Sequence, residues 1–146
     1  MYEVIYGDPE YVKTLQREKD GGIFHISGYV IYVKNDDKTY YLACPEEACR
    51  RKVYENTGHS EQPGKYRCDH CNRCFDSAIP FYMMSCKIGD CSESLYVSFY
   101  RQAAEAILNG TTAEQLRRLK DNGDTVEVEE IFRKAAFRHL TFTLKA

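Results

Sequence analysis

Four segments of the chain carry the hydrophobic pattern of β-strands. The longest, residues 23–34, is rich in β-branched and aromatic side chains, and Gly28 at its centre predicts a bulge or a sharp bend. Residues 81–88 and 95–100 have the same character and predict a second and a third strand. Residues 140–144 alternate leucine or phenylalanine with threonine, which indicates a half-buried fourth strand.

Between the third and the fourth strand, the period changes to that of a helix. A run of alanines ending in Ile107 and Leu108 predicts a short helix that stops at Asn109-Gly110. The start of the next helix is indicated by two overlapping capping-box spacings, Thr111 with Glu114 and Thr112 with Gln115. A third helix carries an apolar stripe with helical spacing: Val128, Ile131, Phe132, Ala135 and Ala136.

Two stretches interrupt this regular pattern. Residues 1–22 mix charges with glycine and proline, and we expect an N-terminal arm or linker with a short helix around residues 11–18. Residues 40–76 have no strong period and hold most of the cysteines. The pattern therefore predicts a mainly β domain with helices (α+β) at residues 23–146, with an insert at about residues 40–76.

The cysteines of this insert have the spacing of a metal site. Four residues separate Cys44 from Cys49, two separate Cys68 from Cys71, and eighteen residues lie between the pairs. Four thiolates brought together on two turns make a tetrahedral sulfur site, which suits zinc. Because four protein ligands leave no open position for water, the predicted zinc is structural rather than catalytic.

Other interpretations of the cysteines fit the sequence less well. The chain has seven cysteines and no visible secretory signal, which favours reduced thiols over a disulfide framework. A redox pair would need a βαβ context, which is missing. His59 and Glu61 precede a cysteine pair as in zinc deaminases, but the six residues from Glu61 to Cys68 are too few for the two helices of that site. His70 is expected to be exposed or to contact a ligand, rather than to be one.

Composition and charge limit the function classes. The chain has 146 residues, with 20 Lys and Arg against 22 Asp and Glu, a net charge of −2. This excludes a globally basic nucleic-acid binder but leaves room for a local basic groove. No apolar run is long enough to cross a membrane. An activated nucleophile, an open metal site and a phosphate loop are all missing, so we do not expect an enzyme.

Alternation along the second and third strands assigns their side chains to two faces. The inward set of the second strand is expected to be Tyr82, Met84, Cys86 and Ile88, and the outward set Phe81, Met83, Ser85 and Lys87. In the third strand, Leu95, Val97 and Phe99 oppose Tyr96, Ser98 and Tyr100. The outward faces thus combine aromatic rings, hydroxyls and a cation, which is what a single-stranded nucleic-acid groove needs. Tyrosines that simply cover the rim of a barrel would give the same pattern.

Four segments resemble one known family. They occur in the same order as in the C-terminal DNA-binding domain of the large subunit of replication protein A: YLACPEEACRRKV (Tyr41–Val53), KYRCDHCNRCF (Lys65–Phe75), SLYVSFYRQAAEAIL (Ser94–Leu108) and EEIFRKAAFRHLTF (Glu129–Phe142). The resemblance implies a five-stranded OB-fold barrel with a zinc ribbon between its first two strands. Since the family continues with a last strand and a helix beyond the position where this chain stops, the expected barrel lacks its last strand.

The resemblance also implies a function and a set of site residues. It implies single-stranded DNA binding in replication, repair and recombination, inside a nuclear heterotrimer of replication protein A subunits. By position, the zinc ligands would be Cys44, Cys49, Cys68 and Cys71. The DNA-binding interpretation takes base stacking from Phe81, Tyr96 and Tyr100; Tyr96 and Tyr100 fall at aromatic positions of the family, whereas Phe81 stands where the relatives usually have a basic residue. In the same interpretation, basic side chains would contact the phosphate backbone: Arg50, Arg51, Lys52, Lys87 and Arg101.

Two alternatives stay open at this point. OB folds also serve as protein-interaction scaffolds, and the near-neutral charge favours such a role in subunit interaction. A paralogue of the same fold could act at telomeres or in meiosis instead of general replication, and the sequence does not separate these roles. Salt dependence of binding would distinguish a DNA-binding module from a scaffold, because phosphate contacts weaken steeply with ionic strength.

Overall fold

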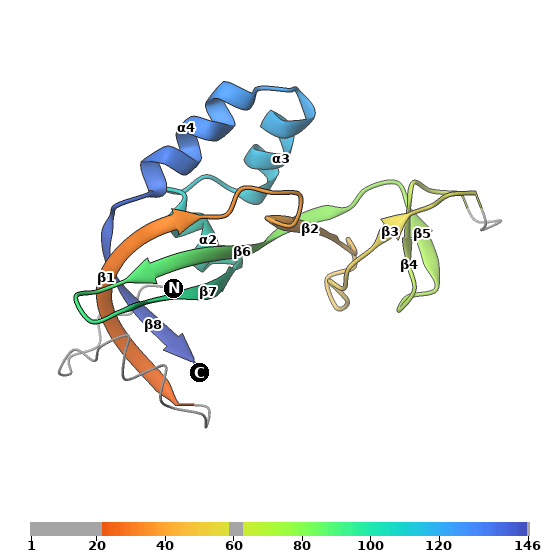
Figure 1. Ribbon diagram of the computed structural model, residues 1–146. Coiled ribbons are helices and arrows are strands. Elements are labelled where there is room, and N and C mark those ends of the chain that lie inside the picture. The colour runs from red at the N-terminus through yellow and green to blue at the C-terminus, as the bar shows by residue number, and fades with distance from the viewer. Residues whose placement is uncertain (1–21, 59–62, 146) are drawn as a thin grey trace.

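The computed structural model describes residues 22–58 and 63–145, which form one large and one small antiparallel sheet (Figure 1). In the large sheet, β1 and β2 lie along one edge of β6, β7 lies along the other edge, and β8 pairs with β1. Its strands are β1 (Ile23–Val33), β2 (Tyr40–Ala43), β6 (Ile79–Gly89), β7 (Ser94–Tyr100) and β8 (His139–Lys145). The four predicted strands are confirmed, whereas β2 had no counterpart in the hydrophobic pattern.

The long strand β1 is strongly curved and joins two parts of the sheet (Figure 1). Its first half, from Ile23 to Tyr29, pairs with β8, and its second half pairs with β6. In the part of the chain that the structure describes, no ladder joins β7 to β8. The rings of Phe99 in β7 and Phe142 in β8 nevertheless lie 5.8 Å apart, so the sheet curls around a shared core.

Gly28 is required at a close approach of two backbones inside this curve. The sequence pattern suggested a bulge or bend there, and the pairing of β1 with β8 runs through Gly28 without a shift. The irregularity lies a few residues later, between Val30 and Tyr32 in the pairing with β6. A Cβ atom at Gly28 would stand 2.5 Å from the carbonyl oxygen of Gly89, so the glycine lets the turn after β6 cross over β1.

We predict that Gly28→Ala destabilises the fold by about 2–3 kcal/mol, because the added methyl group meets backbone that cannot rotate away. Chemical denaturation followed by circular dichroism would measure the change. The control is Ser98→Ala, an exposed position in the adjoining β7, which should shift the midpoint only slightly. An unchanged midpoint for Gly28→Ala would contradict this account of the close approach.

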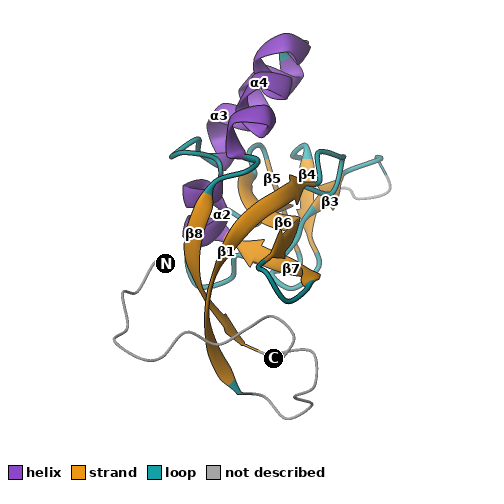
Figure 2. Ribbon diagram, turned by 60° about the vertical axis from the view of Figure 1, so that its left-hand side comes forward, coloured by secondary structure: helices purple, strands orange, loops and turns teal. Residues whose placement is uncertain are grey.

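Three helices follow β7 and cover one end of the sheet (Figure 2). They are α2 (Arg101–Ile107), α3 (Ala113–Asp121) and α4 (Thr125–Ala135). Of the two capping-box spacings, the structure uses Thr112 with Gln115: the threonine hydroxyl accepts from the Gln115 N–H at 3.1 Å, and the glutamine side chain accepts from the Thr112 N–H at 2.9 Å. The predicted apolar stripe of α4 buries Val128, Phe132 and Ala135. The helix expected around residues 11–18 lies outside the described residues.

The buried side chains form two separate clusters. The larger one lies between the curled sheet and the helices, and its fully buried members include Ile26, Met84, Ile88, Ile107 and Leu116. The smaller one holds Cys44, Val53, Tyr66, Cys68 and Ala78. It belongs to the small sheet that stands beside the main one in Figure 1, formed by β3 (Tyr54–Glu55), β4 (Tyr66–Cys68) and β5 (Arg73–Phe75). We call residues 44–78 the ribbon.

None of the helices among residues 22–58 and 63–145 combines the length and the apolar character needed to cross a membrane.

Candidate metal centre and nucleic-acid interface

The four predicted cysteines come together at one point of the ribbon. The Sγ atoms of Cys44, Cys49, Cys68 and Cys71 all lie within 4.8 Å of one another. The Cys44–Cys71 sulfurs are 3.8 Å apart and the Cys49–Cys68 sulfurs 3.7 Å. Four sulfurs at about 2.3 Å from one zinc ion would be about 3.8 Å apart at the corners of a tetrahedron. A disulfide would need about 2.05 Å, so the arrangement has the dimensions of a zinc site and not of two bridges.

Two tight turns of similar shape place these thiols. Each cysteine pair is followed at once by a residue in the left-handed region, Arg50 (φ 51°) after Cys49 and Asn72 (φ 52°) after Cys71. In the second turn, the backbone N–H of Cys71 points at the Cys68 sulfur at 3.4 Å. In the first turn, the Arg50 guanidinium folds back and donates to the carbonyl of Pro45 at 2.9 Å. Arg50 therefore closes the turn that presents Cys44 and Cys49.

The electrostatics of the cluster suit a cation. The hydrogen bond with Cys49, together with burial, raises the pKa of Cys71 to about 12. Burial raises the pKa of Cys44 as well. At Cys68 burial also opposes the charged form, but hydrogen bonds from the Cys71 N–H and the neighbouring thiols outweigh it and lower the pKa. Four thiolates at these distances repel one another and lose hydration on burial. A bound divalent metal ion offsets both costs and so holds the thiolates together.

The remaining candidates around the cluster lie outside it. His70 is exposed, with its Nδ1 atom 3.5 Å from the Cys49 sulfur, so it contacts a cysteine of the cluster as expected. Cys86 is buried in the larger core, where burial raises its thiol pKa to about 12. Cys91 is exposed in the turn after β6. Among the described residues, only the four-cysteine group has the composition and spacing of a metal site.

One arginine attaches the ribbon to the helices. Arg117 of α3 donates a hydrogen bond to the Tyr66 hydroxyl at 2.9 Å and another to the Ala78 carbonyl at 3.0 Å. Both acceptors belong to the small buried cluster around the cysteines. The Arg117 guanidinium is also 3.8 Å from the carboxylate of Asp121, one turn further along α3. The link fixes the direction in which the ribbon leaves the main sheet.

We predict that Arg117→Met loosens the ribbon without removing its metal. The methionine keeps much of the aliphatic stem but loses both donors, so the ribbon is expected to reorient while the cysteines keep their mutual geometry. A zinc assay should give unchanged metal content, and residual dipolar couplings should show a changed or averaged orientation of β4 relative to β6. Arg118→Met is the matched control, since Arg118 is the exposed neighbour on the same helix. An unchanged orientation in Arg117→Met would contradict the proposed link.

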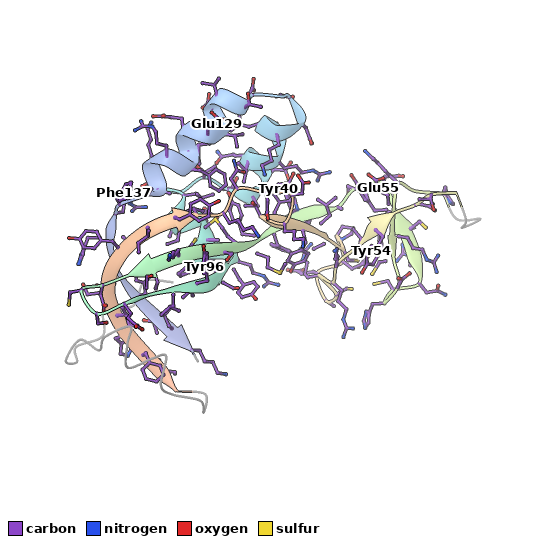
Figure 3. The ribbon with its side chains drawn as sticks, viewed as in Figure 1. Tyr40, Tyr54, Glu55, Tyr96, Glu129 and Phe137 are labelled. Carbon is purple, nitrogen blue, oxygen red and sulfur yellow. The ribbon has the colours of Figure 1, made fainter. Side chains whose placement is uncertain are left out.

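The outward side chains of β6 and β7 form a second candidate site. We call this the outer sheet face: Phe81, Met83, Ser85, Lys87, Tyr96, Ser98 and Tyr100. The predicted inward set of β6 is confirmed as buried, and the outward residues of β7 are exposed. Tyr96 is 61% and Tyr100 55% exposed, which is unusual for side chains of this size on a folded sheet. Figure 3 shows Tyr96 projecting from this face, with Tyr54 further along on the ribbon.

Cations lie against the rings of this face. The Nζ atom of Lys87 is 5.8 Å from the centre of the Tyr96 ring, directly across the strand pair. The Arg101 guanidinium is 4.7 Å from the centre of the Phe81 ring. On the ribbon, Lys52 is exposed and lies 5.4 Å from the Tyr54 ring. Positive charge and aromatic surface therefore occur in pairs over the outer sheet face and the ribbon.

The face also contains residues that the sequence pattern did not identify. Tyr32 of β1, 49% exposed, lies opposite Lys87, so Tyr32, Lys87 and Tyr96 form one row across three strands. Strict alternation from Val30 would place Tyr32 on the buried side, but the irregularity after Val30 shifts the phase of β1 by one residue and exposes the ring. Tyr41 lies opposite Phe81, with ring centres 6.1 Å apart. In the sequence, the only signal of this irregularity is Gly28, which lies a few residues earlier in β1.

Comparison with known proteins gives the context of these two sites. Residues 23–146 match the model of the replication factor-A C-terminal domain. The 70 kDa DNA-binding subunit of replication protein A from Mus musculus is 33% identical over 116 residues, which are 80% of this chain and 17% of that protein. Replication factor A protein 1 of Schizosaccharomyces pombe is 27% identical over 101 residues, covering 69% of this chain and 15% of the relative. The chain thus spans less than a fifth of the length of these relatives.

Solved structures share the fold at lower identity. One, described as yeast RPA bound to ssDNA, superposes with a TM-score of 0.78 at 22% identity and covers 95% of this chain and 76% of that chain. Another, of a replication protein A heterotrimer bound to ssDNA, has a TM-score of 0.76 at 24% identity and covers 88% of this chain and 28% of that one. The Mus musculus relative is named as a DNA-binding subunit, in keeping with the expectation that this chain is not an enzyme. On the match over residues 23–146, the chain belongs to the replication factor-A C-terminal domain family.

Proposed function

We propose that this chain binds single-stranded DNA through the outer sheet face, without strong sequence preference. The observation that carries the proposal is the row Tyr32, Lys87 and Tyr96, in which two exposed rings flank a cation across three paired strands. Rings stack on bases of any sequence, and a cation between them contacts the phosphates. Tyr100 and the pair of Phe81 with Arg101 extend the row toward α2.

We propose that the four-cysteine cluster holds zinc as a structural ion. The sulfur spacing of 3.7–3.8 Å and the all-sulfur donor set fit zinc, and four protein ligands would leave no position for a substrate. The metal would order the turns that carry Arg51, Lys52 and Tyr54 beside the sheet. Arg51 and Lys52 are then the phosphate contacts of the ribbon, whereas Arg50 acts mainly by closing its turn.

The wider assignments follow from the relatives. Relatives are described as subunits of replication protein A and as a heterotrimer bound to ssDNA, which supports the same activity, association with the other two subunits, and a nuclear role in replication, repair and recombination for this chain. The strand order and the curl of the large sheet support an OB-type barrel at residues 23–146, whereas residues 1–21 of the expected arm lie outside the described residues.

A scaffold for protein contacts is the second candidate, and one observation favours it. Phe137, 79% exposed, follows the end of α4, and Val126, 80% exposed, lies in its first turn, whereas the outer sheet face is formed by β6 and β7 (Figure 3, where Phe137 and Tyr96 are labelled). Exposed apolar side chains at such a place suit a protein partner and offer nothing to a phosphate.

The test of DNA binding is fluorescence anisotropy with a labelled oligothymidylate at several salt concentrations. We expect binding that weakens as salt rises, with a slope of about 0.7 for each phosphate contact in a plot of log affinity against log salt. Lys87→Gln should lower this slope by about 0.7, the share of one phosphate contact. Lys134→Gln on α4 should leave the slope unchanged. A metal-loaded, folded chain that shows no binding would contradict the DNA-binding proposal and favour the scaffold.

A further inference from the structure

The outer sheet face ends in a cleft that the stacking row does not use. The cleft has a volume of about 680 Å³, within the range of about 300–1,000 Å³ that ligand pockets occupy. It opens where β7 ends and α2 begins, and the start of α3 forms its far side. Phe81 and Tyr100 belong both to the outer sheet face and to the cleft wall. The cleft therefore adjoins the outer sheet face at these two rings.

The near wall of the cleft offers surfaces for a flat ring. The Phe81 ring is covered on one side by the Arg101 guanidinium at 4.7 Å, and Tyr100 stands at the mouth. Arg101 holds this position with a backbone φ of 45°, a conformation that is unfavourable for a residue with a side chain. Below the rings, Pro80 and Tyr82 are buried, and the Tyr82 hydroxyl is already used in a hydrogen bond to the Thr111 carbonyl at 2.7 Å. The wall is thus apolar and has its own polar groups satisfied.

The cleft also carries acidic side chains, in contrast to this apolar wall. Two carboxylates line the cleft, Glu105 from α2 and Glu114 from the start of α3. The Thr112 side chain, which also faces the cleft, is held in the capping box of α3. Two carboxylates repel a phosphate but accept hydrogen bonds, so the cleft suits the edge of a base that donates them. Cytosine, adenine and guanine carry an exocyclic amino group, whereas thymine presents a carbonyl oxygen at the same position as the cytosine amine.

We propose that the cleft receives one unstacked base of the bound strand, and that Glu105 and Glu114 favour a base with an exocyclic amino group over thymine. The inference rests on the DNA-binding function proposed above. It adds a modest preference at one position to binding that is otherwise independent of sequence.

The test compares a thymidine octamer with octamers that carry one cytidine at either end or in the middle. Eight nucleotides fall within the site size of OB folds, which is about 4–16 nucleotides. Cytosine is chosen because it matches thymine in ring size, so stacking changes little. An octamer with uracil at the same place removes the methyl group but keeps the carbonyl, so the comparison of cytosine with uracil isolates the amino group. We expect cytidine at one end to bind about fivefold tighter or more than uridine there, the lower range for one good base-edge contact.

Variants separate the cleft from the face. Glu105→Gln and Glu114→Gln should reduce the ratio of cytidine to uridine affinity toward one, because an amide accepts from either base or donates to it. Glu127→Gln, an exposed position on α4, is the matched control and should keep the ratio. Tyr96→Ala should weaken all octamers equally. A normal affinity for the thymidine octamer with a ratio of one in the parent chain would overturn the cleft proposal alone, whereas loss of binding to every octamer would overturn the DNA-binding function itself.

One further outcome would also decide against the proposal. If cytidine improves binding equally at both ends and in the middle, the preference arises on the stacking row and not in a single cleft. The same holds if Glu105→Gln and Glu114→Gln leave the ratio unchanged while raising the affinity for all octamers, since that result describes general charge repulsion.

Discussion

Replacement of Cys68 by serine is expected to release the metal, unfold the ribbon and weaken DNA binding together. Cys68 is fully buried, and its sulfur accepts the N–H of Cys71 as well as contacting Cys49. The small cluster around it contains few apolar side chains besides the cysteines themselves, so it cannot replace the metal as a source of stability. Zinc content should fall from about one ion per chain to nearly none. Affinity for oligothymidylate should fall by about tenfold, as Arg51, Lys52 and Tyr54 lose their fixed positions.

The large sheet should survive this change, because its buried cluster shares no residue with that of the ribbon. Hydrogen exchange is the suitable measurement: amides of β4 and β5 should lose protection, while those of β1 and β6 keep it. Cys91→Ser is the matched control, since this exposed cysteine lies outside the cluster. A Cys68→Ser chain that is free of zinc, has an ordered ribbon and binds DNA normally would contradict the coupling of metal and function.

The second large effect is expected at the two exposed tyrosines of β7. Tyr96→Ala and Tyr100→Ala should each weaken binding of oligothymidylate by about 1–3 kcal/mol, or roughly five- to 150-fold, the range measured for one stacked base. Because both side chains are more than half exposed, their removal takes little from the core, and the melting temperature should change only slightly. Fluorescence anisotropy at fixed salt gives the affinity, and thermal denaturation gives the stability.

Two further variants make this result specific. Tyr96→Phe keeps the ring and should keep most of the affinity, since stacking does not need the hydroxyl. Phe137→Ala removes an even more exposed ring, just after α4, and should leave DNA binding unchanged. If Phe137→Ala weakens binding as much as Tyr96→Ala does, the strand follows another surface of the molecule.

The hydrophobic pattern predicted the elements whose signals are local. β1, β6, β7 and β8 lie within three residues of their expected ends, and the Thr112 capping box begins α3 as its spacing indicated. The cysteine spacing likewise predicted which four sulfurs meet, because two short turns decide the geometry of each pair.

What the pattern missed depends on contacts between distant residues. β2 and the strands of the ribbon are only two to four residues long, too short to show a period, and they exist because they pair with β6 or surround the cysteines. The bonds of Arg117 to Tyr66 and Ala78 join residues far apart in the sequence. Strict alternation along β1 would bury Tyr32, and one extra residue between Val30 and Tyr32 reverses that alternation.

The position of the ribbon between β2 and β6 also has a consequence for the order of folding. Ala43 at the end of β2 pairs with Ile79 at the start of β6, so the whole ribbon is the loop that this pairing must close. Once a metal joins Cys44 to Cys71, the free part of that loop shrinks to residues 72–78, because Cys44 directly follows β2. Each halving of a loop lowers its closure cost by about 0.6 kcal/mol. A chain that has bound zinc in the ribbon would therefore pair β2 with β6 at a closure cost lower by roughly 1.4 kcal/mol, a little over two halvings of the loop.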